Sequence, residues 1–239
     1  MSKPVTQRLT PGLIGMSPRT NAVYYQMMHE EGDRLLGVPV SFRSVLVSPS
    51  FNAVISSLNS SDTQALEQLL LTSAREAVAA GAGFIVVTSN TGSTLADSLA
   101  QMCGVPVLNI VDPVIQAANA GGCRKVGLLS TMHTARSGMY ARGGRANGIE
   151  FIDLPEELGE LLNQLIVTDI ALGRPSAAAR KQICSLIEHF RDVGADAVAL
   201  ACTDLTLLEL QPGETALPVL DSTLLHAKAA AANAVPSWQ

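Results

Sequence analysis

The chain has 239 residues, of which 47% are hydrophobic, 15% charged and 4% aromatic. This composition supplies enough apolar material for one large or two small packed domains, and it excludes a disordered chain. A formal net charge of −5 leaves no basic excess for a phosphate backbone, so we expect no nucleic-acid partner.

Targeting and metal-binding signals are missing from the sequence. The N-terminal segment has no signal-peptide core, and no run approaches the ~20 apolar residues of a membrane span, so we expect a cytoplasmic protein with no membrane contact. The four cysteines show no CxxC spacing and the four histidines no HExxH spacing. We therefore predict neither a metal site nor disulfides.

Short apolar segments that end in small or polar residues predict buried parallel strands. In chain order they lie at 12–17, 84–87, 105–109, 127–132, 197–201 and 217–221. Helical patterns at 66–80 and 177–193 each stop at a glycine, Gly81 and Gly194, and a helix-prone tail covers 223–235.

These segments form an internal repeat. The segments 12–17, 81–87 and 105–109 resemble 127–132, 194–201 and 217–221, which follow them by 115, 113 and 112 residues. The same order of strands and helices therefore occurs twice along the chain. This predicts an α/β fold of two pseudo-symmetric Rossmann-like half-domains, each a parallel sheet flanked by helices. We place the first half-domain at 1–115, completed by a C-terminal helix at 223–239, and the second at 116–222.

Ligands bind outside the carboxyl ends of parallel strands, so we expect the active site in the crevice between the two halves. The strand at 84–87 runs into the polar sequence 88–93, and its counterpart runs into Cys202. Although a cysteine in an apolar run is usually packing, its place at a strand end indicates an acid/base thiol. Ungapped matching puts Ser89 opposite Cys202 and a one-residue slip puts Thr88 there, so the repeat leaves both open.

Four motifs resemble the aspartate/glutamate racemase superfamily over residues 12–227. They are 12–17 followed by Tyr24-Tyr25, Asn90-Thr91, 201–205 and 221–227. The resemblance implies a homodimer that needs no pyridoxal phosphate, metal or nucleotide and that inverts Cα between two cysteines. One glycine is missing before Met16, and Gly92-Ser93 replaces a Met-His pair.

The main departure from the family is Thr88, which takes the place of the first catalytic cysteine in that resemblance. A thiol has a pKa near 8.5, whereas an unactivated hydroxyl ionises no more easily than water and so has a far higher pKa. The difference is roughly 10 kcal/mol, so Thr88 cannot simply replace a thiolate. We predict that Cys202 removes the Cα proton and that Thr88, aided by Ser89, donates one on the other face. The kinetics should then be strongly asymmetric.

The resemblance also suggests the substrate, a dicarboxylic amino acid such as aspartate or glutamate. The expected substrate-binding residues are Met16, Arg43, Ser89, Asn90, Thr91, Thr131 and Thr203. Asn90, Thr91 and Thr203 would hold the α-carboxylate and Arg43 the side-chain carboxylate, although a solvated surface role for Arg43 stays open. His226 recurs in the family, and a structural role for it also stays open.

Two other functions remain. Relatives with a single cysteine in the second half decarboxylate or isomerise malonate- or maleate-type acids, and decarboxylation needs only one acid. Alternatively, the chain is a non-catalytic amino-acid-binding relative that lost the reaction with its first thiol.

Overall fold

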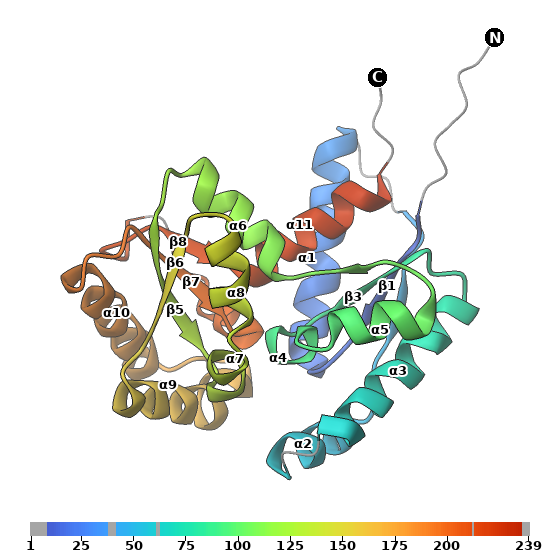
Figure 1. Ribbon diagram of the computed structural model, residues 1–239, viewed down its shortest axis with the longest axis horizontal. Coiled ribbons are helices and arrows are strands. Elements are labelled where there is room, and N and C mark those ends of the chain that lie inside the picture. The colour runs from blue at the N-terminus through green and yellow to red at the C-terminus, as the bar shows by residue number, and fades with distance from the viewer. Residues whose placement is uncertain (1–8, 38–41, 61–62, 212, 236–239) are drawn as a thin grey trace. The chain divides into compact units, whose positions relative to one another are not determined.

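The computed structural model describes residues 9–37, 42–60, 63–211 and 213–235 and divides the chain into two compact units (Figure 1). The first contains the residues up to Asn109 and those from His226 on, and the second contains Ile110–Leu225. The helix at 111–120 belongs to the second unit, so the unit boundary precedes the boundary placed from the sequence by six residues. The reason is packing, because Val114 and Ile115 contact the same core as Val126.

The first unit contains a four-stranded parallel sheet in the order β2-β1-β3-β4. Its strands are β1 (Pro11–Ile14), β2 (Val45–Val47), β3 (Phe84–Val87) and β4 (Val107–Leu108). Its helices are α1 (Pro18–Leu36), α2 (Phe51–Asn59), α3 (Thr63–Ala79), α4 (Asn90–Ser93), α5 (Ala96–Cys103) and most of α11 (Ser222–Ala234).

Alternation along the strands of the first sheet supplies two cores. Leu13, Phe84 and Val86 pack against α1 and α11 on one face of the sheet. Ile14 and Val87 face the other way and pack against α2, α3 and α5. Strands that are apolar on both faces are typical of a parallel sheet covered by two helical layers, as the sequence predicts.

The second unit repeats this plan with the order β6-β5-β7-β8, again all parallel. Its strands are β5 (Lys125–Ser130), β6 (Glu150–Asp153), β7 (Ala197–Ala201) and β8 (Val219–Asp221). Its helices are α6 (Val111–Ala120), α7 (Met132–Ser137), α8 (Met139–Ala146), α9 (Glu156–Thr168) and α10 (Ala177–Asp192), with the 3₁₀ helices η1 (Ile170–Leu172) and η2 (Thr203–Leu208). One core lies under α9 and α10 and the other under α6 and α8.

A glycine at the same place in β1 and β5 allows a helix layer to approach the sheet closely. A Cβ on Gly12 would lie 3.1 Å from the Ala77 Cβ of α3, and one on Gly127 would lie 2.3 Å from the Phe190 ring of α10. The predicted duplication of an α/β half-domain is therefore confirmed in strand order and in the residues that make each core possible. Among the described residues, no helix is long and apolar enough to span a bilayer.

Candidate functional site

The C-terminal ends of all four strands lie together along one side of each sheet, and we call that side the carboxyl edge. In the first unit this edge carries Gly15, Met16, Ser48 and the polar stretch that begins at Thr88. In the second unit it carries Thr131, Cys202 and Asp221. Because strands that run in parallel end together, the fold gathers these side chains at the two carboxyl edges.

Strand register settles which hydroxyl corresponds to Cys202. Ile14 pairs with Val87 in the first sheet, and Leu129, its counterpart in the repeat, pairs with Leu200 in the second. Counting on from these pairs, Thr88 corresponds to Ala201 and Ser89 corresponds to Cys202. Of the two alternatives that the repeat leaves open, the register therefore selects Ser89.

Backbone shape and burial agree with the pairing of Ser89 and Cys202. Each residue directly precedes a short helix, and the backbone of each is extended. The angles are φ −158° and ψ 136° for Ser89 and φ −131° and ψ 126° for Cys202. Ser89 is 8% exposed and Cys202 7% exposed, whereas Thr88 is 0% exposed. These two residues therefore occupy the same structural position in their units.

The Thr88 hydroxyl belongs to a buried network inside the first unit. It lies 3.0 Å from the Asn21 Oδ1 and 3.2 Å from the Ile14 carbonyl oxygen, and both of these atoms can only accept its proton. The Asn21 amide nitrogen then donates to the Ser48 hydroxyl at 3.1 Å. Thr88 thus joins the ends of β1 and β3 to α1, and its proton is directed into the protein.

The Ser89 hydroxyl caps the short helix α4 by accepting from the Gly92 N–H at 3.2 Å. Among the described residues, no hydrogen bond uses the Ser89 hydroxyl proton. Its oxygen is fixed by the cap while its proton is available for transfer, which is what a proton donor at this edge requires.

The predicted first-unit residues Met16, Asn90 and Thr91 lie around the same turn. Asn90 is buried and Thr91 is half-buried on α4. A Cβ on Gly92 would lie 2.8 Å from a Val87 methyl and 3.5 Å from the Met16 sulfur, so only glycine lets α4 pack this closely on β3. The structure therefore brings Met16 and residues 88–91 together.

Cys202 lies between β7 and η2, at the N-cap position of η2. Burial raises the pKa of its thiol, and the Asp204 carboxylate raises it further, whereas the N–H groups of Asp204 and Leu205 lower it. The resting thiol is therefore protonated at neutral pH. The two N–H groups are in place to stabilise the thiolate when it forms.

The other predicted residues of the second unit lie at the same carboxyl edge. Thr203 follows Cys202 directly and is buried. Thr131 caps α7, accepting from the Thr134 N–H at 3.3 Å. A pocket of about 170 Å³ opens beside the ends of β5 and β6, lined by Ser130, Met132, Asp153 and Glu156 among others.

Arg43 is not brought together with these residues. It precedes β2, at the amino end of the first sheet, and donates to the Ala80 carbonyl oxygen at 2.5 Å. The guanidinium lies beside Gly81, where the helix α3 has ended and β3 has not begun. Parallel strands place this end opposite the carboxyl edge.

His226 is buried within the first unit, and the other three cysteines lie outside the positions described above. His226 is completely buried on α11, where its Nε2 donates to the Leu108 carbonyl oxygen at 3.1 Å, and burial lowers its pKa to about 4. Cys103, Cys123 and Cys184 are free thiols away from both carboxyl edges. Within the described ranges, no group of three or more His, Cys, Asp or Glu side chains could hold a metal ion.

Sequence reasoning did not find Asn21 and Ser48. Asn21 lies within α1, and its amide fills the space beside Gly15, where a Cβ would lie 2.0 Å from the Asn21 Nδ2. The signal was the glycine at the end of the first strand, but nothing in the sequence indicates which side chain occupies the space beside it.

Comparison with known proteins places this geometry in context. The family model described as Asp/Glu/Hydantoin racemase matches residues 13–230. A curated relative, the broad specificity amino-acid racemase RacX of Bacillus subtilis, is 29% identical over 150 residues, which is 62% of this chain and 63% of the relative. The match thus spans less than two thirds of that relative's length.

Solved structures extend the similarity over the whole fold. A candidate Asp/Glu racemase from Yersinia pestis is 33% identical with a TM-score of 0.84, covering 95% of this chain and 99% of that one. An aspartate racemase homologue from Pyrococcus horikoshii is 26% identical with a TM-score of 0.79, covering 94% and 98%. Glutamate racemase from Francisella tularensis, at 13% identity, a TM-score of 0.69 and coverage of 97% and 85%, shares the fold.

Proposed function

Because the chain belongs to the Asp/Glu/Hydantoin racemase family, we propose that it inverts the Cα centre of an amino acid by moving a proton between Cys202 and a hydroxyl of the first unit. The observation that carries this proposal is the equivalence of Ser89 and Cys202 in strand register, capping position and burial. The proposal requires the two carboxyl edges to act on one substrate.

Ser89 is the hydroxyl that we assign to the second face. The Thr88 hydroxyl donates to Asn21 and Ile14, so its use in catalysis would break a buried network. The Ser89 oxygen is fixed by the Gly92 N–H, and among the described residues its proton is donated to no acceptor. A serine hydroxyl protonates a carbanion readily but is a poor base, so the reaction should differ between the two enantiomers.

This asymmetry has a thermodynamic limit. The equilibrium constant between enantiomers is one, so kcat/KM must be equal in both directions. The difference must appear in kcat and KM separately, and in the deuterium that enters unreacted substrate in D₂O. The α-ammonium group of a bound amino acid adds a positive charge, which lowers the pKa of a nearby thiol and prepares Cys202 as the base.

The side chain of the substrate is proposed on similarity alone. Aspartate and glutamate follow from the names of the relatives. Arg43 gives no support, since it lies at the amino end of the first sheet. The pocket beside β5 and β6 carries the carboxylates of Asp153 and Glu156, which disfavour a second substrate carboxylate there. Neutral and basic amino acids therefore belong in the test.

The test is to incubate the protein in D₂O with each enantiomer of aspartate, glutamate, alanine and lysine. Loss of the Cα proton is followed by NMR and inversion by chiral chromatography. We expect exchange with inversion for at least one pair, and its loss in Cys202→Ala. No exchange with any amino acid would reject the racemase and direct attention to a malonate-type decarboxylation or to binding without chemistry.

Two matched variants test the assignment of the second face. Ser89→Cys restores a thiol at the position equivalent to Cys202, and we expect it to raise kcat in the slow direction. Thr88→Cys places the thiol one residue earlier, inside the Asn21 network, and we expect no gain. The opposite result, a gain only in Thr88→Cys, would return the role to Thr88.

A further inference from the structure

Three consecutive side chains, those of Asp221, Ser222 and Thr223, bind the backbone or side chains around Cys202. The Ser222 hydroxyl donates to the Leu200 carbonyl oxygen at 2.6 Å, and the Thr223 hydroxyl to the Thr203 carbonyl oxygen at 3.4 Å. The Thr206 hydroxyl donates to the Asp221 Oδ2 at 2.7 Å. These contacts lie two residues before, one after and four after Cys202, so they bracket it.

Asp221 joins two helices through its two oxygens. Its Oδ2 accepts from Thr206 on η2, while its Oδ1 accepts from the N–H groups of Thr223 and Leu224 at 2.8 and 3.2 Å, at the start of α11. Thr206 and Thr223 are buried. η2 therefore cannot leave the end of the sheet without breaking a hydrogen bond to a carboxylate that is also needed to begin α11.

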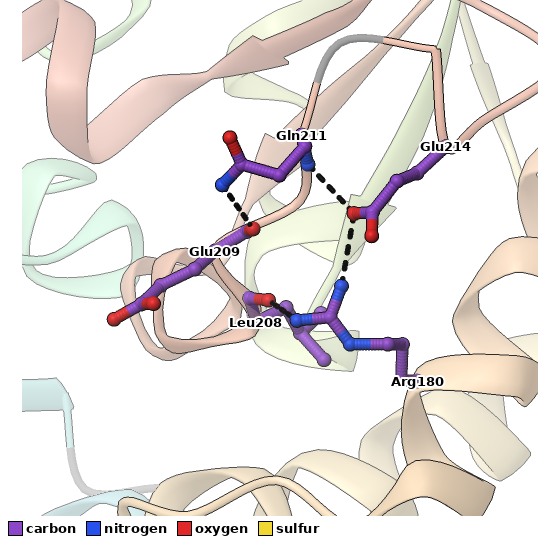
Figure 2. Close-up of polar contacts among 5 residues, drawn as sticks. All are labelled: Arg180, Leu208, Glu209, Gln211 and Glu214. Carbon is purple, nitrogen blue, oxygen red and sulfur yellow. Dashed lines mark hydrogen bonds and ion pairs between the residues drawn. The ribbon is translucent and has the colours of Figure 1, made fainter.

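The other end of η2 is held from α10 (Figure 2). Arg180 donates to the Leu208 carbonyl oxygen and pairs with Glu214 at 3.0 Å. The Gln211 N–H donates to the same Glu214 oxygen at 2.7 Å. Arg180 holds the last residue of η2, and Thr223 binds the carbonyl oxygen of its first residue. Asp221 holds the helix between these two points through Thr206, directly after Leu205, whose N–H reaches the Cys202 thiol.

We propose that Asp221 is a positioning residue that holds η2 through Thr206 and so fixes the Cys202 thiol in its buried place at the carboxyl edge. The geometry involves the second unit alone. Only its consequence for catalysis rests on the proposed function.

A conservative variant separates position from charge. In Asp221→Asn, the amide oxygen can accept from Thr223 and Leu224, and the amide nitrogen can donate to the Thr206 hydroxyl, which also serves as an acceptor. Both links survive in that variant without the negative charge. Asp221→Ala removes both links, whereas Thr206→Val breaks the link to η2 alone.

The measurement is the rate at which iodoacetamide alkylates Cys202, read by mass spectrometry of its peptide, in the absence of any amino acid. Asp221→Ala and Thr206→Val should increase this rate about tenfold, because η2 opens when a hydrogen bond to a carboxylate is lost. Asp221→Asn should match the wild type, as should the control Asp192→Ala, which removes an exposed carboxylate of α10. In Asp221→Ala we expect kcat to fall about 100-fold with little change in KM, because the thiol is misplaced.

Three results would overturn the proposal. Equal effects of Asp221→Asn and Asp221→Ala would indicate a role for charge, and an unchanged alkylation rate in Thr206→Val would show that the link to η2 does not matter. Faster alkylation of buried Cys123 together with Cys202 would indicate general unfolding. If the alkylation rates are as expected while no amino acid exchanges its Cα proton, the positioning role of Asp221 is supported and the racemase proposal fails.

Discussion

Thr88→Val tests whether the Thr88 hydroxyl is structural. The substitution keeps the shape of the side chain and removes only its hydrogen bond. The Ile14 carbonyl oxygen still accepts from the Thr88 N–H at 3.0 Å, so it stays paired. The Asn21 Oδ1 loses the donor at 3.0 Å, and its residue is only 3% exposed.

A buried acceptor left without a partner costs about 1–3 kcal/mol. For a protein of this size, each kcal/mol lowers the melting temperature by about 2–4 °C, so we expect a loss of about 2–12 °C in thermal unfolding followed by circular dichroism. Thr72→Val is the matched control, because its hydroxyl binds the Gln68 carbonyl oxygen on an exposed helix surface and its loss should change stability by less than about 0.5 kcal/mol.

The two possible roles of Thr88 make opposite predictions for activity. If Thr88 is structural, the folded variant at low temperature keeps Cα-proton exchange. An unchanged melting temperature together with lost exchange would refute this reasoning and show that the hydroxyl serves the reaction.

Two further predictions concern stability. Burial lowers the pKa of His226 from its ordinary value of 6.5 to about 4 in the folded protein, so its stabilising contribution is complete above pH 6.5 and is lost as the pH falls towards 4. The loss amounts to about 3 kcal/mol of unfolding free energy. The melting temperature of His226→Gln should therefore fall less steeply between pH 6.5 and 4 than that of the wild type. Parallel curves for the two proteins would contradict the assignment. Gly127→Ala should lower stability by about 1–3 kcal/mol because the new Cβ meets the Phe190 ring, and an unchanged midpoint in urea would show that α10 yields.

The sequence predicted the fold because both of its signals can be read from the order of residue types without knowledge of any contact. Apolar runs such as 84–87 and 197–201 identify strands buried on both faces, and their recurrence about 113 residues apart identifies the duplication. The same repeat could not choose between Thr88 and Ser89, because shifting one segment against the other by one residue matches the same residue types. Only the pairing of Ile14 with Val87 and of Leu129 with Leu200 fixes the register.

The contacts around the site were harder to predict because they join distant residues. Thr88 binds Asn21 across 67 positions, and neither residue carries a sequence signal for the other. The sequence 221–223 stood out only as part of a family motif, without a role. For Arg43, the sequence gives the residue type but not the end of the sheet at which it lies.

The discontinuity of the first unit has a consequence for biosynthesis. Leu13, Phe84 and Val86 bury one face of their sheet against Ala227, Ala230 and Ala231 of α11. A ribosome makes those alanines only after the whole second unit, which is continuous in the chain. Until the second unit has been made, this face of the first sheet is covered by α1 but not by α11, so the part of the apolar surface that α11 will occupy is exposed to chaperones during that interval.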